Sequence, residues 1–139
     1  MGDAFTVRVE IAAPPEAVWA VIGDPEAVPR WYPTYTSARV EGDVRVLRRA
    51  DGVEITERLL ERDEAGMSYA YSVTGGLPLA RPRAAFTVVP GPGGSAVVWR
   101  TEAVHEDPSV DMEARLAPRQ REALEGLRAL VEGRGTATG

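Results

Sequence analysis

The 139-residue sequence contains no cysteine and no lysine. Without cysteine, the chain has no disulfide, no thiol nucleophile and no cysteine-bound zinc. All 16 basic residues are arginine, and together with abundant alanine, glycine and valine they indicate a bacterial genome rich in GC base pairs.

Long apolar runs and basic runs are also missing. No hydrophobic segment approaches the roughly 18 residues that a membrane-spanning helix needs, and the alternating segment between Asp3 and Glu10 does not have the pattern of a signal peptide. The net charge of −5 and the lack of basic clusters argue against nucleic-acid binding. We expect a soluble, cytoplasmic domain that binds neither membranes nor nucleic acid.

Motifs of the common catalytic classes are absent as well. The chain has one histidine, His105, and no cluster of His, Asp and Glu with the spacing of metal ligands. The glycine-rich stretch 91–94 lacks the following lysine of a phosphate-binding loop, and no Gly-x-Ser-x-Gly motif occurs. We therefore expect no metal and no cofactor.

The longest helical pattern covers residues 109–132. Its apolar side chains recur at helical spacing and form one stripe, with charged residues mostly on the other side. Asp107 and Ser109 supply capping side chains at its start, and Gly133 supplies a stop. Pro118 lies inside the pattern, so we expect a kink there or a helix that restarts at this residue.

Most of the chain before this helix has the pattern of β-strands. Alternation over residues 5–11 predicts a half-buried strand, and two short helices follow, one ended by Gly23 and one that runs from Asp24 to Pro29. Six further strands are expected, joined by turns that include a two-residue hairpin turn at 51–52 and a Gly/Pro loop at 75–82. These six strands are residues 36–41, 44–50, 53–63, 67–74, 84–89 and 95–105.

This order predicts a single α+β domain over residues 1–139, with 134–139 as a loose tail. Short connections favour a curved, seven-stranded antiparallel sheet. The long C-terminal helix is the only long element that can cover the apolar face of the sheet. We therefore expect the sheet to wrap around it, with a cavity between the two.

Three segments carry a resemblance to a known family. They are VRVEIAAPPEAVWAVIGDPEAVPRWYP, ITERLLERDEAGMSYAYSV and VVPGPGGSAVVWRTEA. Together they resemble the polyketide cyclase/dehydrase and lipid-transport superfamily, whose members are also called START-like, Bet v 1-like or helix-grip proteins. The resemblance covers residues 4–132 and implies a helix-grip fold that holds an apolar ligand between sheet and helix. The family includes cyclases, dehydratases, lipid carriers, hormone receptors and chaperone activators.

Alternation along the strands predicts which side chains face the cavity. In residues 53–63 and 95–105 the odd-numbered positions point inward. The expected hairpins turn Tyr69 inward too and place Phe86 opposite Trp99, so that an aromatic wall forms. The predicted ligand-binding residues are Trp31, Tyr35, Tyr71, Phe86, Trp99, Thr101, Met112 and Leu116.

Three polar residues are candidates for catalysis. Glu57 is a single carboxylate on an apolar strand face, where it serves as a general acid or base or forms an ion pair with Arg48 or Arg39. His105 lies at a strand exit, either as a proton carrier at the cavity mouth or as a solvated side chain. Tyr69 donates a hydrogen bond to a ligand carbonyl or packs in the core.

Other side chains also keep two interpretations. Trp31, Tyr32 and Tyr35 form a lid over the opening or a loop anchored by aromatic packing. Arg83 meets an anionic or carbonyl group at the entrance or stays in solvent. Trp19 is expected in the core beneath the first short helix.

These features leave three functions open. The first is a cyclase or dehydratase for a polyketide-like or aromatic substrate, in which the cavity holds the reacting carbons together and polar residues move protons and stabilise enolate charge. The second is a carrier or sensor that only buries an apolar small molecule. The third is an interaction module with a filled core. We expect a monomer or a homodimer.

Overall fold

The structure, a computed structural model, describes residues 4–77 and 79–136. Within these ranges it contains seven strands, three α-helices and one 3-10 turn. In chain order they are β1 (Ala4–Ile11), α1 (Pro15–Ile22), η1 (Pro25–Ala27), α2 (Val28–Trp31), β2 (Tyr35–Glu41), β3 (Val44–Arg49), β4 (Glu54–Asp63), β5 (Ser68–Gly75), β6 (Leu79–Gly91), β7 (Gly94–His105) and α3 (Met112–Thr136).

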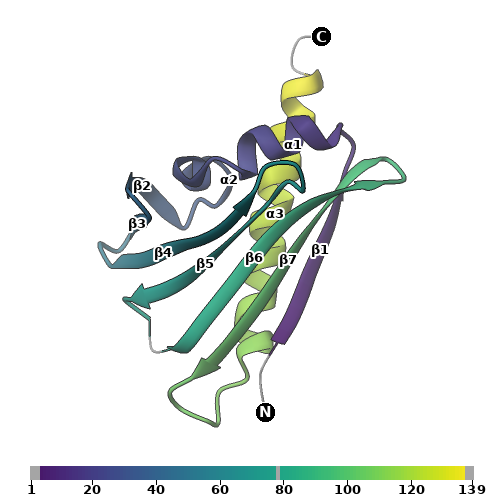
Figure 1. The fold of residues 1–139 in the computed structure, drawn as a ribbon. Coiled ribbons are helices and arrows are strands. Elements are labelled where there is room, and N and C mark those ends of the chain that lie inside the picture. Colours follow the sequence, from purple (N-terminus) through teal and green to yellow (C-terminus); the bar gives the residue numbers. More distant parts are fainter. Residues whose placement is uncertain (1–3, 78, 137–139) are drawn as a thin grey trace.

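The strands form one antiparallel sheet in the order β1-β7-β6-β5-β4-β3-β2. Figure 1 shows this sheet bending around α3, with α1 and α2 near the C-terminal part of that helix. The predicted fold class, a helix-grip arrangement of seven strands around a long C-terminal helix with two short helical segments after the first strand, is confirmed.

Alternation along β1 explains how the sheet meets α3. Phe5, Val7, Val9 and Ile11 are all buried, while the residues between them are exposed. They pack in the same core as the buried stripe of α3, as the period-2 and helical patterns predicted. The α3 residues of that core are Met112, Ala123, Leu124, Leu127 and Val131.

The position of α3 leaves part of the sheet uncovered. The helix contacts mainly β1 and β7, and α2 bridges from α3 to β2 at the opposite edge. The carboxylate of Glu132 accepts a 2.8 Å hydrogen bond from the Ala12 backbone N–H, which ties the end of α3 to the end of β1. Among the strands, α3 therefore packs chiefly on β1 and β7, at one side of the sheet.

The start of α3 differs from the prediction. The helix begins at Met112, because Asp111 accepts a 3.1 Å hydrogen bond from the Ala114 backbone N–H and so caps it. Asp107 caps a separate turn instead, through a 3.0 Å bond from the Ser109 N–H. Both aspartates have the right chemistry for an N-cap, and the sequence pattern selected the earlier one.

Gly133 and Pro29 do not mark the helix ends that the sequence predicted at them. Gly133 does not stop α3, which continues to Thr136, so part of the expected tail is helical. The helix also runs through Pro118 without restarting. Pro29 lies in the first turn of α2 and does not end a helix, because a first-turn residue has no intrahelical partner for its N–H.

The predicted loop at 75–82 is mostly strand. β5 extends to Gly75 and β6 begins at Leu79, and residue 78 lies outside the described residues. The β6–β7 register shifts between Ala80 and Arg83. This irregularity accommodates Pro82, since a proline cannot donate to a regular ladder.

The first short helix is correctly predicted, but Trp19 is not a core residue. Its ring is half-buried, and its indole N–H donates a 2.9 Å hydrogen bond to Glu64. The guanidinium of Arg62 lies over the ring, 4.8 Å from the centroid, and donates to the Gly23 carbonyl oxygen at 2.7 Å. Trp19 therefore anchors α1 to β4 at the surface.

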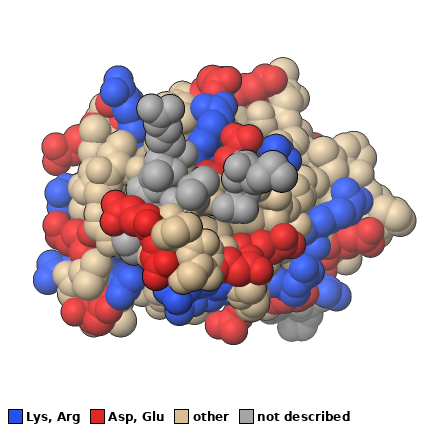
Figure 2. All heavy atoms as spheres, turned by 90° about the horizontal axis from the view of Figure 1, so that it is seen from below, with Lys and Arg blue, Asp and Glu red and all other residues tan. Residues whose placement is uncertain are grey.

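Charges of both signs are mixed on the surface. Figure 2 shows acidic and arginine side chains side by side on the end face of the molecule that it draws. Within residues 4–77 and 79–136, no helix has the length and apolar character needed to cross a membrane.

A close backbone contact sets the distance between α2 and α3. A Cβ atom added at Gly126 would lie 2.6 Å from the Trp31 carbonyl oxygen, whereas one added at Gly133 would meet nothing within 4 Å. We predict that Gly126→Ala lowers the free energy of unfolding by about 1–3 kcal/mol, because α2 must move away from α3. Gly133→Ala is the matched control and should raise it by roughly 0.5–1 kcal/mol. Urea unfolding measures both, and equal effects would show that the close contact does not hold.

Candidate functional site

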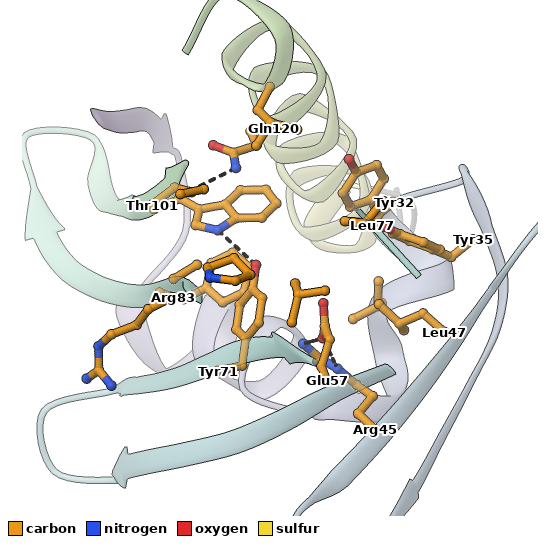
Figure 3. A pocket seen from close by; sticks show the side chains of 18 of the residues that line it. Tyr32, Tyr35, Arg45, Leu47, Glu57, Tyr71, Leu77, Arg83, Thr101 and Gln120 are labelled. Atoms are coloured by element: carbon orange, nitrogen blue, oxygen red, sulfur yellow. Dashed lines mark hydrogen bonds and ion pairs between the residues drawn. The ribbon is translucent and has the colours of Figure 1, made fainter. Parts of the chain in front are cut away.

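A cavity opens between the concave face of the sheet, α2 and α3 (Figure 3). Its empty volume is about 680 Å³ with the open mouth included. Most of the predicted site residues border it. They are Trp31, Tyr35, Glu57, Tyr71, Phe86, Trp99, Thr101 and Leu116.

Three predicted residues do not border this cavity. Tyr69 and Met112 are buried in the core and are not among the residues that line the cavity. His105 ends β7, and its Nδ1 atom accepts a 2.9 Å hydrogen bond from the Asp107 backbone N–H. In the part of the chain that the structure describes, no group of three His, Asp or Glu side chains is placed to hold a metal ion.

The predicted aromatic wall is present. Phe86 and Trp99 lie opposite each other in the β6–β7 register, with ring centroids 4.5 Å apart. Trp31 meets both rings edge-on, at 5.7 and 6.1 Å, and Tyr71 lies 5.8 Å from Phe86. These edge and tilted contacts are the favourable geometries for aromatic pairs.

The aromatic loop of Trp31, Tyr32 and Tyr35 packs on the core and also borders the cavity, so parts of both predicted interpretations apply. Trp31 is only 1% exposed and belongs to the core, yet it also lines the cavity. The ring centroids of Tyr32 and Tyr35 are 4.9 Å apart, and both residues are half-buried at the cavity edge. Burial raises the pKa of both phenols, so they remain neutral hydrogen-bonding groups.

The hydroxyl of Tyr71 has a defined polarity. The indole N–H of Trp99 donates to its oxygen at 3.2 Å, and indole can only donate. Within the described residues no group accepts the proton of Tyr71 itself. Burial raises the pKa of Tyr71 well above its ordinary value, so the proton stays on the oxygen and is available to a ligand.

Glu57 lies in an ion pair, as one of its two interpretations required, but its partner is Arg45. The Arg45 Nε and Nη2 atoms donate to Glu57 Oε1 at 2.8 and 2.5 Å. The side chains are 2% and 6% exposed. Arg45 also donates to the Tyr69 hydroxyl and to the Pro25 carbonyl oxygen, each at 3.2 Å. The expected partners, Arg48 and Arg39, do not contact Glu57.

The wrong partner was predicted because the hairpin turn has one more residue than expected. The Arg49 N–H donates to the Val53 carbonyl at 2.8 Å, so the loop spans three residues and ends at Gly52 with φ of +89°. This register places Arg45 opposite Glu57 in the β3–β4 ladder. A one-residue slip exchanges the two faces of a strand, which is why Arg48 points outward.

The carboxylate of Glu57 presents one free oxygen to the cavity. All of its hydrogen bonds in the described structure go to Oε1, and Figure 3 shows the group among the cavity-lining side chains. Burial raises the pKa of Glu57, and the charge and hydrogen bonds of Arg45 oppose this. Burial disfavours the charge on Arg45, but Tyr69 and Glu57 outweigh it and raise the pKa of Arg45.

Sequence reasoning missed two polar residues of the cavity. Arg45 could be found only from the true hairpin register. Gln120 was visible as a polar residue inside the apolar stripe of α3. It is 5% exposed, and its Nε2 atom donates a 3.0 Å hydrogen bond to the Thr101 hydroxyl.

Arg83 lines the cavity with its stem. Its guanidinium points away from the interior in Figure 3 and pairs with Glu61 of β4. Of the two interpretations of Arg83, this geometry favours the one in which the charged group stays in solvent.

Known proteins share this architecture. The family model described as polyketide cyclase / dehydrase and lipid transport matches residues 3–132. No curated protein matches the sequence. A solved protein of uncharacterised function from Bacillus thuringiensis is 27% identical, with a TM-score of 0.84 over 92% of this chain and 98% of that one.

Two more distant structures share the fold. A START superfamily protein from Mycobacterium smegmatis is 20% identical, with a TM-score of 0.78 over 93% of this chain and 97% of that one. Norcoclaurine synthase from Thalictrum flavum, solved in complex with dopamine and hydroxybenzaldehyde, is 17% identical, with a TM-score of 0.73 over 94% of this chain and 87% of that one.

Removal of Arg45 should expose the cost of burying Glu57. We predict that Arg45→Met lowers the free energy of unfolding by about 3–5 kcal/mol at neutral pH, because an unpaired carboxylate remains inside. Without Arg45 the pKa of Glu57 rises further above its ordinary 4.5. The folded state then binds more protons than the unfolded state above about that pH, so stability falls as the pH rises.

The double variant Arg45→Met/Glu57→Gln provides the control. It carries no buried charge at this site, so its stability should lack that pH dependence. Urea unfolding between pH 4 and pH 8 compares the two proteins, and parallel pH profiles would contradict the buried-pair account.

Proposed function

Because the chain belongs to the polyketide cyclase/dehydrase and lipid transport family, we propose that its cavity binds an apolar, aromatic small molecule. The observation that carries this proposal is an aromatic wall beside two oriented polar groups, the free oxygen of Glu57 and the hydroxyl proton of Tyr71. Ligand pockets typically combine apolar walls with a few fixed polar groups.

The lining of the cavity supports a ring-containing ligand, because apolar and aromatic side chains make up most of it. Trp99, Phe86 and Tyr71 offer ring faces and edges against which a planar molecule packs. Norcoclaurine synthase, which shares the fold, holds the aromatic molecules dopamine and hydroxybenzaldehyde.

The finer proposal is a cyclase or dehydratase reaction of the kind that builds polyketides. Glu57 Oε2 takes a proton from a carbon between two carbonyls, and the electron pair of the broken C–H bond forms an enolate. The Tyr71 hydroxyl donates to the enolate oxygen. The enolate carbon attacks a second carbonyl carbon held next to it, and the new alkoxide takes the proton back from Glu57. Loss of water then completes a dehydration.

Other predicted catalytic residues take lesser parts in this scheme. Tyr69 accepts a hydrogen bond from Arg45 and so helps to hold the ion pair, at a position that does not border the cavity. His105 lies outside the cavity lining, which leaves Glu57 as the proton carrier.

A carrier or sensor is the second candidate. Arg45 makes two hydrogen bonds to Glu57, and a carboxylate held this way is a weaker base. In this alternative the same cavity only removes the ligand from water. An interaction module with a filled core fits less well, because a cavity is present.

Binding is tested with 2-naphthol as an aromatic probe. Val73 lines the cavity, and we predict that Val73→Phe fills the space and weakens binding at least tenfold in isothermal titration calorimetry. Val53→Phe makes the same change at a surface residue that is 38% exposed and should leave the affinity unchanged. If 2-naphthol does not bind, or binds both variants equally, the cavity is not an aromatic-ligand site.

Catalysis is tested with a linear poly-β-carbonyl thioester. We predict that Glu57→Gln lowers the rate of cyclisation by about 10²–10⁴-fold and keeps the affinity for 2-naphthol. Glu54→Gln removes an exposed carboxylate from the same strand and should leave the rate unchanged. Probe binding without any turnover of the thioester would favour the carrier, and turnover that survives Glu57→Gln would exclude Glu57 as the base.

A further inference from the structure

Two buried polar atoms that belong to cavity-lining residues have no hydrogen-bond partner in the described structure. They are Oε1 of Gln120 and Nε1 of Trp31. The two residues are 5% and 1% exposed. Buried polar groups are nearly always paired, so an unpaired one calls for a missing partner.

No described residue pairs with the side-chain oxygen of Gln120. Its amide bonds to Thr101, and the core residues that follow it on this face of α3 are Ala123, Leu124 and Leu127, which are all apolar. If the amide is turned over so that Thr101 donates to the oxygen, the NH₂ group becomes the unpaired one. In either orientation one half of the amide is left over.

Trp31 Nε1 is a buried donor without an acceptor, whereas Gln120 Oε1 is a buried acceptor without a donor. The neighbours Phe86, Trp99 and Tyr32 meet Trp31 through their rings, and rings offer its N–H no strong acceptor. The indole N–H can only donate, and the Gln120 carbonyl can only accept. A hydroxyl group, which donates and accepts, can satisfy both kinds of atom.

The two polar ends of the cavity lie apart. Figure 3 shows Gln120 and Thr101 on the α3 side, Arg45 and Glu57 on the opposite side, and Tyr71 between them. The aromatic wall therefore separates a polar group on the helix side from the ion pair on the sheet side.

We propose that the ligand is a planar aromatic molecule with oxygen substituents at both ends. One hydroxyl donates to Glu57 Oε2. The other donates to the Gln120 carbonyl, which can turn toward it because the terminal torsion of glutamine is soft, and accepts from Trp31 Nε1. This inference rests on the proposed function and adds the substitution pattern of the ligand.

Three naphthalene probes test the pattern by calorimetry. They are 2-naphthol, 2,6-dihydroxynaphthalene and 6-methoxy-2-naphthol, of which the last can accept but not donate at its second oxygen. The wild-type chain should bind the diol at least fivefold more tightly than either of the others. Gln120→Met keeps the length of the side chain and should abolish this preference. Arg121→Met changes an exposed neighbour on α3 and should preserve it.

Equal preference in the wild-type and Gln120→Met chains would overturn the inference and make Gln120 a purely structural partner of Thr101. If the preference is equal while the probes still bind and Val73→Phe still blocks them, only the substitution pattern is overturned and the proposed function stands. If no probe binds, the proposed function fails together with it.

A measurement on the wild-type chain keeps the inference testable should Gln120→Met not fold. The indole N–H signal of Trp31 is assigned in a ¹H–¹⁵N spectrum by its loss in Trp31→Phe. The diol should shift this signal downfield, as a new acceptor does. An unchanged signal at saturating diol would contradict the proposal.

Discussion

The ion pair between Arg45 and Glu57 links more of this molecule than any other polar contact described. Arg45 is on β3 and Glu57 on β4, and the same guanidinium reaches Tyr69 on β5 and the Pro25 carbonyl of η1. One buried cation thus ties three strands to the segment that precedes α2. A buried charge is tolerated only when its partners are in place, so this cluster requires one register of the sheet and one position of the short helices.

The cavity is a consequence of where the helices touch the sheet. α3 packs on β1 and β7, and the Gly126–Trp31 contact fixes how closely α2 approaches it. Leu116 and Trp31 come from these helices and line the remaining space together with Trp99. Wall atoms without neighbours lose dispersion contacts, so empty space of this kind lowers stability. A ligand that fills it restores those contacts and stabilises the folded state.

The sequence predicts faces better than it predicts ends. Period-2 alternation placed Glu57 inside, because one face of the sheet must be buried. The expected turn at 91–94 also placed Phe86 opposite Trp99 correctly. The expected turn at 51–52 gave the wrong partner for Glu57, since one more loop residue before Val53 exchanges Arg48 for Arg45. The start of α3 was also predicted at the wrong residue. Asp107 and Asp111 both have a side chain suited to a cap, and the structure uses Asp111 for α3 and Asp107 for the turn before it.

Two groups that can only donate hydrogen bonds, the Arg45 guanidinium and the Trp99 indole, determine which polar atoms remain unpaired in the cavity. Arg45 occupies one oxygen of Glu57, which leaves the other as an acceptor, and the Trp99 indole occupies the Tyr71 oxygen, which leaves its proton as a donor. Neither arrangement can be reversed by rotating a hydroxyl or an amide. In the function that we propose, this acceptor and this donor beside an aromatic wall select a ligand that carries a hydroxyl and a carbonyl or enolate oxygen. In that proposal the same pair serves proton transfer if the ligand is reactive and recognition if it is not, so the reactivity of the ligand decides between enzyme and carrier.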